Sequence, residues 1–319
     1  MPTRVRPRFG SLQYWPRKRI RKAVPSVNWS PVEKSASKTV SDEGLLGFIS
    51  YKVGMTSVIV KDNTDKSMTK GKKVTMPATI LEVPNFKIFS VRFYKKGKVM
   101  KDVIVSTDKI LKKKLKIPKE VQKIEGVEGF DDIRVIIYPV MKDMFKKAPD
   151  LAEVGIKAAD KLEFIKGLIG KEISMAEVMK WNLVDVRGLT RGKGFQGPVK
   201  RFGITLKSHK SEKGVRRPGS IGPWHPARVI FRVPMAGQLG TFTRVHYNSK
   251  VIDSGNIKDE GKDINRKNGF KNYGNVAGSY IMVAGSVQGP SKRQILITPA
   301  MRPNKKQTKR QYELLEVLK

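Results

Sequence analysis

Three histidines, His209, His225 and His246, stand in one tract of the 319-residue chain and could form a metal site or an acid–base set. Their spacings of 16 and 21 residues match no helical zinc pattern. A nucleophilic triad needs an orienting carboxylate, and only Glu212 is close in the sequence. We therefore expect no enzyme, no bound metal and no cofactor, with an enzyme that uses His225 and Glu212 as the alternative.

The segment RGKGFQG (191–197) contains the pattern G-x-G-x-x-G at Gly192, Gly194 and Gly197. The pattern does not indicate a dinucleotide site, because basic residues rather than an apolar helix follow Pro198. Glycines also let a backbone approach phosphates closely, and the cations that would supply charge here are Arg191, Lys193, Lys200 and Arg201. A mobile surface loop is the alternative interpretation.

Aromatic rings lie within basic sequence. In GSIGPWHPARV (219–229), Trp224 and His225 are flanked by prolines, and Phe195 lies between Gly194 and Gln196. A ring can stack on a nucleic-acid base, which contributes roughly 1–3 kcal/mol. We expect Trp224 at such a surface, whereas a local core suits Phe195 equally well. Three further rings, which could bind a partner or dock on their own domain, are Tyr14, Trp15 and Trp29.

Positive charge dominates the composition. The chain has 65 lysines and arginines against 28 aspartates and glutamates, a net charge of +37. Such an excess opposes compaction unless a polyanion neutralises it, so nucleic acid is the favoured partner. A membrane surface is disfavoured, because the chain shows no amphipathic helix and its basic residues are spread over loops. No apolar run approaches the roughly 18–20 residues of a membrane span. The absence of cysteine excludes disulfides and thiolate metal sites.

The charge is unevenly distributed. Residues 1–32 hold eight basic residues and no acid, and residues 187–252 hold 14 basic residues and one acid. Residues 101–186 are nearly neutral, with 17 basic and 15 acidic residues. This contrast is typical of a protein with one face on a polyanion and another in solvent. The run KILKKKLKIPK (109–119) indicates a solvated face or a secondary contact.

Strand patterns occur early and late in the chain, around a mixed middle. We expect strands in 45–62 with a turn at Gly54, in 74–83 after a loop at 69–73, in 87–105 as a pair about KKGK, in 133–141, in 183–188, and in 280–299 as a final pair. Leu162, Ile165 and Ile169 predict a helix, and Ser174 with Glu177 has capping-box spacing. The pattern predicts a β-rich α+β fold, with a β-barrel that carries an α+β insertion.

Several of these segments together are similar to one known family. They are TRGKGFQGPVKRFG (190–203), RRPGSIGPWHPARV (216–229), MAGQLGTFTRV (235–245), GLLGFISYKVGMT (44–56) and SVQGPSKRQILI (286–297). In this order they resemble the "L-three" family of large-subunit ribosomal proteins. The length, the mid-chain insertion and the WHPA form resemble its archaeal members.

The resemblance implies a translation-protein-type β-barrel with an inserted α+β region, a basic N-terminal arm and a long basic central loop. On this basis we expect a basic arm at 1–43, barrel strands at 44–100, a near-neutral α+β insertion at 101–182, further barrel strands at 183–299 that include the loop 187–252, and a basic tail at 300–319.

The resemblance also implies a structural constituent of the large ribosomal subunit in the cytoplasm. Such a protein binds large-subunit (23S-type) rRNA, whose structural Mg²⁺ ions lie nearby, together with neighbouring large-subunit ribosomal proteins, and it acts early in assembly. Trp224 matches the tryptophan at the loop tip, near the peptidyl-transferase centre and the aminoacyl-tRNA path. Gln238 matches a glutamine that bacterial members N-methylate. The alternative is an RNA-modifying or RNA-cleaving enzyme that uses His225.

The residues expected to bind rRNA come from the arm and the loop. They are Arg4, Arg6, Arg8, Arg17 and Arg19 in the arm, and Arg191, Lys193, Phe195, Lys200, Arg201, Lys207, His209, Lys210, Arg216, Arg217, Trp224, His225, Arg228, Gln238 and Arg244 in the loop.

Overall fold

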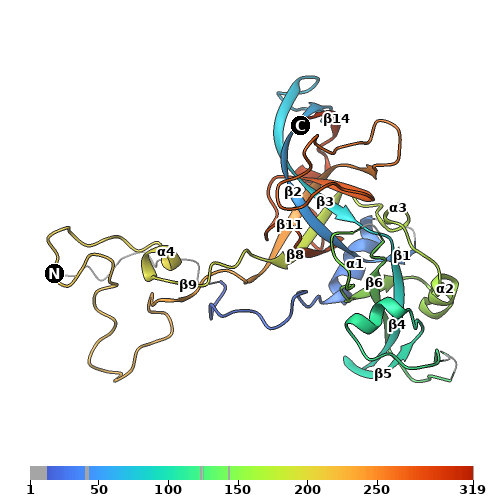
Figure 1. Cartoon of the computed structure of the whole chain (residues 1–319), viewed down its shortest axis with the longest axis horizontal. Helices are drawn as coiled ribbons and strands as arrows, with labels where there is room; N and C mark the ends of the chain where they lie inside the picture. The colour runs from blue at the N-terminus through green and yellow to red at the C-terminus, as the bar shows by residue number, and fades with distance from the viewer. Residues whose placement is uncertain (1–12, 40–42, 123, 125, 143, 319) are drawn as a thin grey trace. The chain divides into compact units, whose positions relative to one another are not determined.

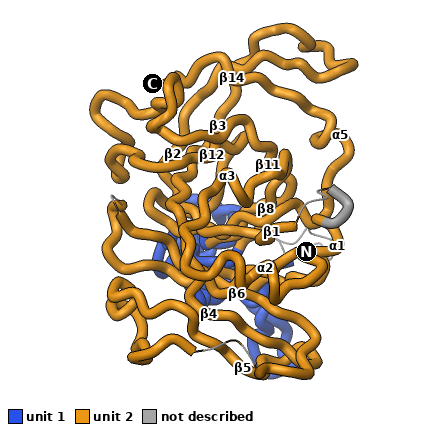
Figure 2. The backbone as a smooth tube through the Cα atoms, turned by 90° about the vertical axis from the view of Figure 1, so that its right-hand side faces the viewer, with its two compact units in different colours: residues 1–23, 189–243 blue, residues 24–188, 244–319 orange. Residues whose placement is uncertain are grey.

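The computed structural model describes the chain except for residues 1–12, 40–42, 123, 125, 143 and 319 (Figure 1). The chain forms two compact units (Figure 2). Residues 1–23 and 189–243 make up the first, called here the arm–loop unit, and residues 24–188 and 244–319 make up the second, called the sheet unit. The fold is β-rich α+β, as the sequence predicts.

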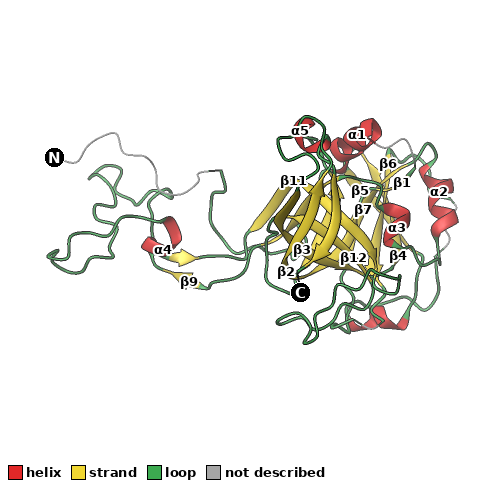
Figure 3. Ribbon diagram, turned by 90° about the horizontal axis from the view of Figure 1, so that it is seen from above, coloured by secondary structure: helices red, strands yellow, loops and turns green. Residues whose placement is uncertain are grey.

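The larger sheet of the sheet unit has seven strands in the order β13-β8-β11-β12-β3-β2-β14 (Figure 3). Because β13 also pairs with β2, six of these strands form a closed ring of pairings, and β14 is attached to β2 outside it. The strands are β2 (Phe48–Asp62), β3 (Lys73–Val83), β8 (Leu183–Leu189), β11 (Thr243–Asn256), β12 (Ser279–Ala284), β13 (Gln294–Pro299) and β14 (Tyr312–Val317).

A second sheet of five strands has the order β1-β7-β6-β4-β5. Its strands are β1 (Gly44–Leu45), β4 (Phe86–Lys95), β5 (Lys98–Ile104), β6 (Asp132–Pro139) and β7 (Ala152–Lys157). The helices of the sheet unit are α1 (Trp29–Thr39), the 3-10 helix η1 (Lys109–Lys113), α2 (Lys161–Leu168), α3 (Met175–Val178) and α5 (Lys305–Thr308). The glutamate of the predicted capping box, Glu177, accepts hydrogen bonds from the Ser174 amide at 3.2 Å and hydroxyl at 2.7 Å.

Helix α1 is held in the core by Trp29, whose side chain is only 2% exposed. The ring packs on β7 at Gly155, where a Cβ atom would lie 3.0 Å from ring atoms, so this close approach needs glycine. Val32 and Ala36 follow Trp29 at helical spacing and are also buried. Helix α1, which lies within the expected basic arm 1–43, therefore belongs to the core of the sheet unit, and of the two alternatives for Trp29 the structure shows docking on its own domain.

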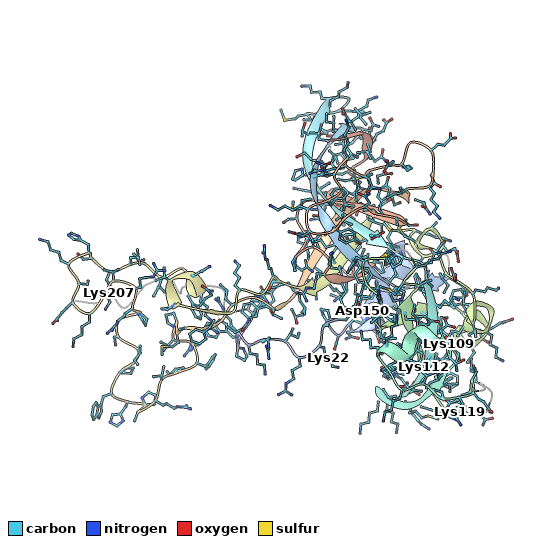
Figure 4. All side chains as sticks on the ribbon, in the orientation of Figure 1. Lys22, Lys109, Lys112, Lys119, Asp150 and Lys207 are labelled. Atoms are coloured by element: carbon cyan, nitrogen blue, oxygen red, sulfur yellow. The ribbon has the colours of Figure 1, made fainter. Side chains whose placement is uncertain are left out.

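A buried carboxylate, Asp150, connects the segment before β7 to the larger sheet (Figure 4). It accepts hydrogen bonds from the Tyr51 hydroxyl of β2 at 2.9 Å, from Lys146 at 2.6 Å and from Lys114 at 2.9 Å. Burial raises the pKa of Asp150, but the hydrogen bonds from Lys146 and Lys114 outweigh burial and hold the pKa below its usual range. The carboxylate therefore stays ionised and holds the segment before β7 against β2 of the larger sheet.

Most of the expected strands form. The structure confirms the strands expected near 74–83, 87–105, 133–141 and 183–188. The turn predicted at Gly54 is wrong, because β2 runs through it as one strand and the glycine sits at a register shift against β3. The two strands predicted over 280–299 form, but the prediction that they pair with each other is wrong. Strand β12 pairs with β11 and β3, whereas β13 pairs with β8 and β2. Non-local partners, which local patterns do not contain, decide both outcomes.

Residues 300–319, which the sequence marks as basic, contain α5 and strand β14. Within β14, Tyr312, Leu314 and Val317 pack on the core. The run 109–119 is likewise partly anchored: Leu111 is buried beside Phe89 and Tyr138, while Lys109, Lys112 and Lys113 are exposed.

We predict that Trp29→Ala lowers the free energy of unfolding by about 3–5 kcal/mol, because it leaves a cavity under α1. Urea unfolding of the full chain measures this. Trp224→Ala is the matched control, since that ring is exposed, and we expect a change of no more than about 0.5 kcal/mol. Equal effects of the two substitutions would contradict the packing described for α1.

Candidate nucleic-acid interface

The arm–loop unit is organised by a short ladder where the long loop begins and ends. The Thr190 amide donates to the Phe242 carbonyl at 2.9 Å, and the Lys193 amide donates to the Leu239 carbonyl at 2.9 Å. The Leu239 amide donates in return to the Gly194 carbonyl at 2.9 Å. Strands β9 (Phe195–Gln196) and β10 (Gly237–Gln238) continue this ladder. The 40 residues between β9 and β10 therefore leave and return at one stem.

The two sides of the stem approach most closely at Gly240. This residue has a φ of +78°, and a Cβ atom on it would lie 2.0 Å from the Arg191 carbonyl oxygen. Both the backbone conformation and the space exclude any other residue. Glycine in the AGQLG segment is thus required by the stem itself.

Helix α4 (Pro198–Phe202) follows β9. It begins with proline, which suits the first helical turn, and ends at Gly203 with a φ of +68°. The G-x-G-x-x-G segment therefore leads into a single basic helical turn with Lys200 and Arg201 on it, and not into the long apolar helix of a dinucleotide fold.

Arg201 fastens the stem to the arm. Its guanidinium donates to the carbonyls of Met235 at 2.9 Å, Gln238 at 3.0 Å and Arg17 at 2.9 Å. Arg17 donates in return to the Arg201 carbonyl at 2.6 Å. Burial lowers the pKa of Arg201. A planar fork of donors can satisfy several carbonyls at once, so one side chain joins three chain segments.

Aromatic rings complete this fastening. The Arg17 guanidinium lies 4.2 Å from the Phe202 ring centroid, and Trp15 stacks on Phe202 at 5.5 Å. Phe231, from the far part of the loop, meets Trp15 edge-to-face at 5.9 Å. Together Arg17, Arg201, Trp15, Phe202 and Phe231 form what we call the arginine clasp. Trp15 thus docks on its own unit. Arg17 and Arg201, both predicted to contact rRNA, donate hydrogen bonds to carbonyls of the protein itself.

Apart from Phe231, the loop between 206 and 234 lies outside the clasp and has no helix or strand. Figure 4 labels one of its cations, Lys207. The exposed cations of the loop are Arg191, Lys193, Lys200, Lys207, Lys210, Lys213, Arg216, Arg217, Arg228 and Arg232, and Arg19 and Lys22 are exposed in the arm. Residues 1–23 and 189–243 contain 19 lysines and arginines and a single carboxylate, Glu212. Carboxylates of the same unit therefore cannot neutralise this charge.

Large rings are exposed among these cations. Trp224 is 88% exposed, Phe195 is 77% exposed and Phe231 is 69% exposed. Of the two fates considered for Phe195, the structure shows an exposed ring rather than a core residue. Phe231 was not singled out from the sequence, although its place between Arg228 and Arg232 is the same signal that marks Trp224. The arm–loop unit thus exposes three aromatic rings among positively charged side chains.

The histidines do not form a cluster. His209 and His225 are exposed in the loop, and His246 lies on β11 of the sheet unit, where its Nδ1 is 2.5 Å from the Ser249 hydroxyl. Among the residues that the structure describes, no group of three His, Cys, Asp or Glu side chains could hold a metal ion. His225 is followed by a cis peptide bond to Pro226.

The other predicted residues lie as follows. Gln238 is half-buried in the stem, and its side-chain nitrogen donates to the carbonyls of Leu239 at 3.2 Å and Gly240 at 3.1 Å. Arg244 is half-buried in the sheet unit. Arg4, Arg6 and Arg8 lie outside the described residues.

We predict that Arg201→Lys loosens the stem while the sheet unit stays folded. A lysine has its three donors on a single nitrogen and cannot match three carbonyls that are bound by three separate guanidinium nitrogens, so the local opening free energy should fall by about 1–3 kcal/mol. Hydrogen exchange at the Lys193 and Leu239 amides measures this, because both amides donate across the stem. Lys200→Ala, a change at the exposed neighbouring cation, is the control. Unchanged exchange in Arg201→Lys would contradict the role of the clasp.

No helix among the described residues is long and apolar enough to span a membrane. Comparison with known proteins gives a consistent relationship along the chain. The family model "Ribosomal protein L3" matches residues 1–115 and 95–317.

Three archaeal relatives illustrate the similarity, each described as "Large ribosomal subunit protein uL3". The protein of Methanococcus vannielii is 39% identical, with 93% of this chain and 92% of the relative covered. The proteins of Methanocaldococcus jannaschii and Archaeoglobus fulgidus are each 37% identical, covering 93% and 94% of this chain and 92% and 93% of the relatives. The chain belongs to the ribosomal protein L3 family.

Proposed function

We propose that the chain is a structural constituent of the large ribosomal subunit and binds large-subunit, 23S-type rRNA directly through the arm–loop unit. The observation that carries the proposal is the uncompensated positive charge of this unit, which has 19 lysines and arginines and one carboxylate. Its stem is held by hydrogen bonds from Arg201 to backbone carbonyls, which leave this charge in place. Phosphates are the counter-charges that this unit lacks. The relatives are described as proteins of the large ribosomal subunit, which supports the same assignment for this chain.

The geometry suits folded RNA better than an open duplex surface. Glycines permit close approach to phosphates, and prolines on either side of Trp224 and His225 lower the entropy lost when the loop is ordered. Exposed rings can stack on splayed bases, as in RNA recognition generally. Trp224 at 88% exposure is the foremost such ring.

The contacts divide into two groups. The exposed cations, together with Trp224, Phe195, His209 and His225, bind RNA, and Phe231 joins them. Arg17 and Arg201 hold the unit together and act as positioning residues. Gln238, the modification candidate, sits within the stem with both donors of its amide directed at carbonyls. Methylation of that nitrogen would leave one of these hydrogen bonds unmade.

The finer proposals follow the family resemblance. The six-stranded ring is the translation-protein-type barrel, and the chain enters the subunit early in assembly in the cytoplasm, beside neighbouring ribosomal proteins. The Trp224 tip lies near the peptidyl-transferase centre and the aminoacyl-tRNA path, with rRNA-bound Mg²⁺ nearby. The role of the tip is to position RNA rather than to catalyse a reaction.

We predict that the salt dependence of rRNA binding comes from the loop. Replacing Lys207, Lys210, Arg216 and Arg217 by alanine should reduce the slope of log K against log salt by about 3, because each phosphate contact contributes roughly 0.7–0.9. Filter binding to large-subunit rRNA fragments measures the slope. The matched control replaces four exposed lysines of the sheet unit, Lys98, Lys101, Lys112 and Lys113. An equal loss of slope in both variants would refute the assignment to the loop.

We predict that Trp224→Ala leaves the chain folded and incorporated but changes the chemical reactivity of the rRNA around the loop tip. The lost stacking corresponds to about 1–3 kcal/mol at that contact. Chemical probing of mutant particles measures the change, and Trp224→Phe, which keeps a ring, should restore much of the wild-type pattern. A reactivity pattern identical to wild type in Trp224→Ala would disprove a role for this ring.

A further inference from the structure

Strand β14 leaves one edge of the sheet unit open. It pairs with β2 from Tyr312 opposite Asp62 to Val317 opposite Val58. In the part of the chain that the structure describes, β2 is its only strand partner. The other edge of β14 therefore has backbone amides and carbonyls that pair with no strand formed by the described residues.

A groove runs along this open edge. It has a volume of about 880 Å³ and lies between β14 and the segment 252–264. Ile252 and Ile264 line it as buried side chains, while Leu315 of β14 and Leu318, which directly follows β14, are 43% and 37% exposed. The groove thus combines apolar surface with a free strand edge, the two features that an added strand uses.

The charge of the groove is opposite to that of the chain. Its lining includes Asp253, Asp263, Glu313 and Glu316, and Lys262 is the one cation among the lining residues. Lys262 is already bound to Asp253 at 2.8 Å. In a chain of net charge +37, this surface repels phosphates. An occupant of the groove has to be cationic.

We propose that β14 receives an extended, lysine- and arginine-rich segment of another protein as an additional strand. Backbone hydrogen bonds to the open edge hold the segment, and Leu315 and Leu318 contact its apolar side chains. Glu313, Glu316 and Asp263 select for its basic residues. The six residues of β14 accommodate a segment of similar length, about 20 Å when extended. The inference concerns the sheet unit and is independent of the proposed RNA role of the loop.

Carbodiimide coupling tests the proposal on complexes recovered from cells through a tag on the full-length chain. The reagent joins carboxylates to lysines in direct contact, and added glycine ethyl ester labels carboxylates that are accessible. We expect Glu313 and Glu316 to couple to lysines within one short segment of a second protein. We also expect both to resist labelling, whereas the exposed Glu120 and Glu163 are labelled freely.

A charge-reversed variant completes the test. Glu313→Lys with Glu316→Lys should lower the amount of the cross-linked partner that is retained by about tenfold. Glu120→Lys with Glu163→Lys makes the same change of charge elsewhere and should retain the partner. Free labelling at Glu313 and Glu316, or coupling only within the chain, would overturn the proposal. Protection that RNase removes would assign the groove to RNA and overturn it equally.

Discussion

The arm–loop unit depends on how Arg201 uses its charge. In most proteins a guanidinium finds a carboxylate, but residues 1–23 and 189–243 offer only Glu212. Arg201 instead donates to three backbone carbonyls, and Arg17 lies on the ring of Phe202. Carbonyl oxygens and ring faces attract cations without cancelling their net charge. The unit can therefore be folded and remain strongly positive, which a unit built on ion pairs could not achieve.

The sheet unit uses the opposite arrangement. Two of its arginines are paired with carboxylates: Arg92 contacts Asp102 at 2.7 Å and Glu153 at 3.0 Å, and Arg134 contacts Glu153 at 2.9 Å. Carboxylates of its own therefore offset part of the charge of this unit, and a hydrophobic core lies around its two sheets. Positive charge is densest where glycines and exposed rings also occur, because the 78 residues of the arm–loop unit hold 19 cations and one carboxylate, whereas the 241 residues of the sheet unit hold 46 and 27. This difference in charge density between the two units, rather than the total net charge of +37, favours RNA as the partner of the arm–loop unit.

Sequence patterns predicted the elements well where the determinants are local. The hairpin about KKGK forms because Lys96 and Gly97, with φ of 49° and 73°, suit a tight turn. Patterns failed where the determinants are distant in sequence. The strand order of β12 and β13 depends on partners far along the chain, and the continuity of β2 through Gly54 depends on a register shift in its pairing with β3. At the candidate site, the exposed cations and Trp224 were predictable from type and spacing. The hydrogen bonds from Arg201 to backbone carbonyls could not be predicted, because nothing in the segment KRFG indicates which carbonyls lie within reach of its side chain.

We propose that the arm–loop unit is embedded in the folded RNA of a large ribosomal subunit. Sedimentation of the native protein from lysate, before and after a high-salt wash, tests it most directly. The account predicts about one copy per large subunit, retained through the wash, because loop and rings are enclosed by RNA as well as attracted to phosphates. Protein at the top of the gradient, or protein removed by modest salt, would contradict embedding and indicate a peripheral factor held by charge alone.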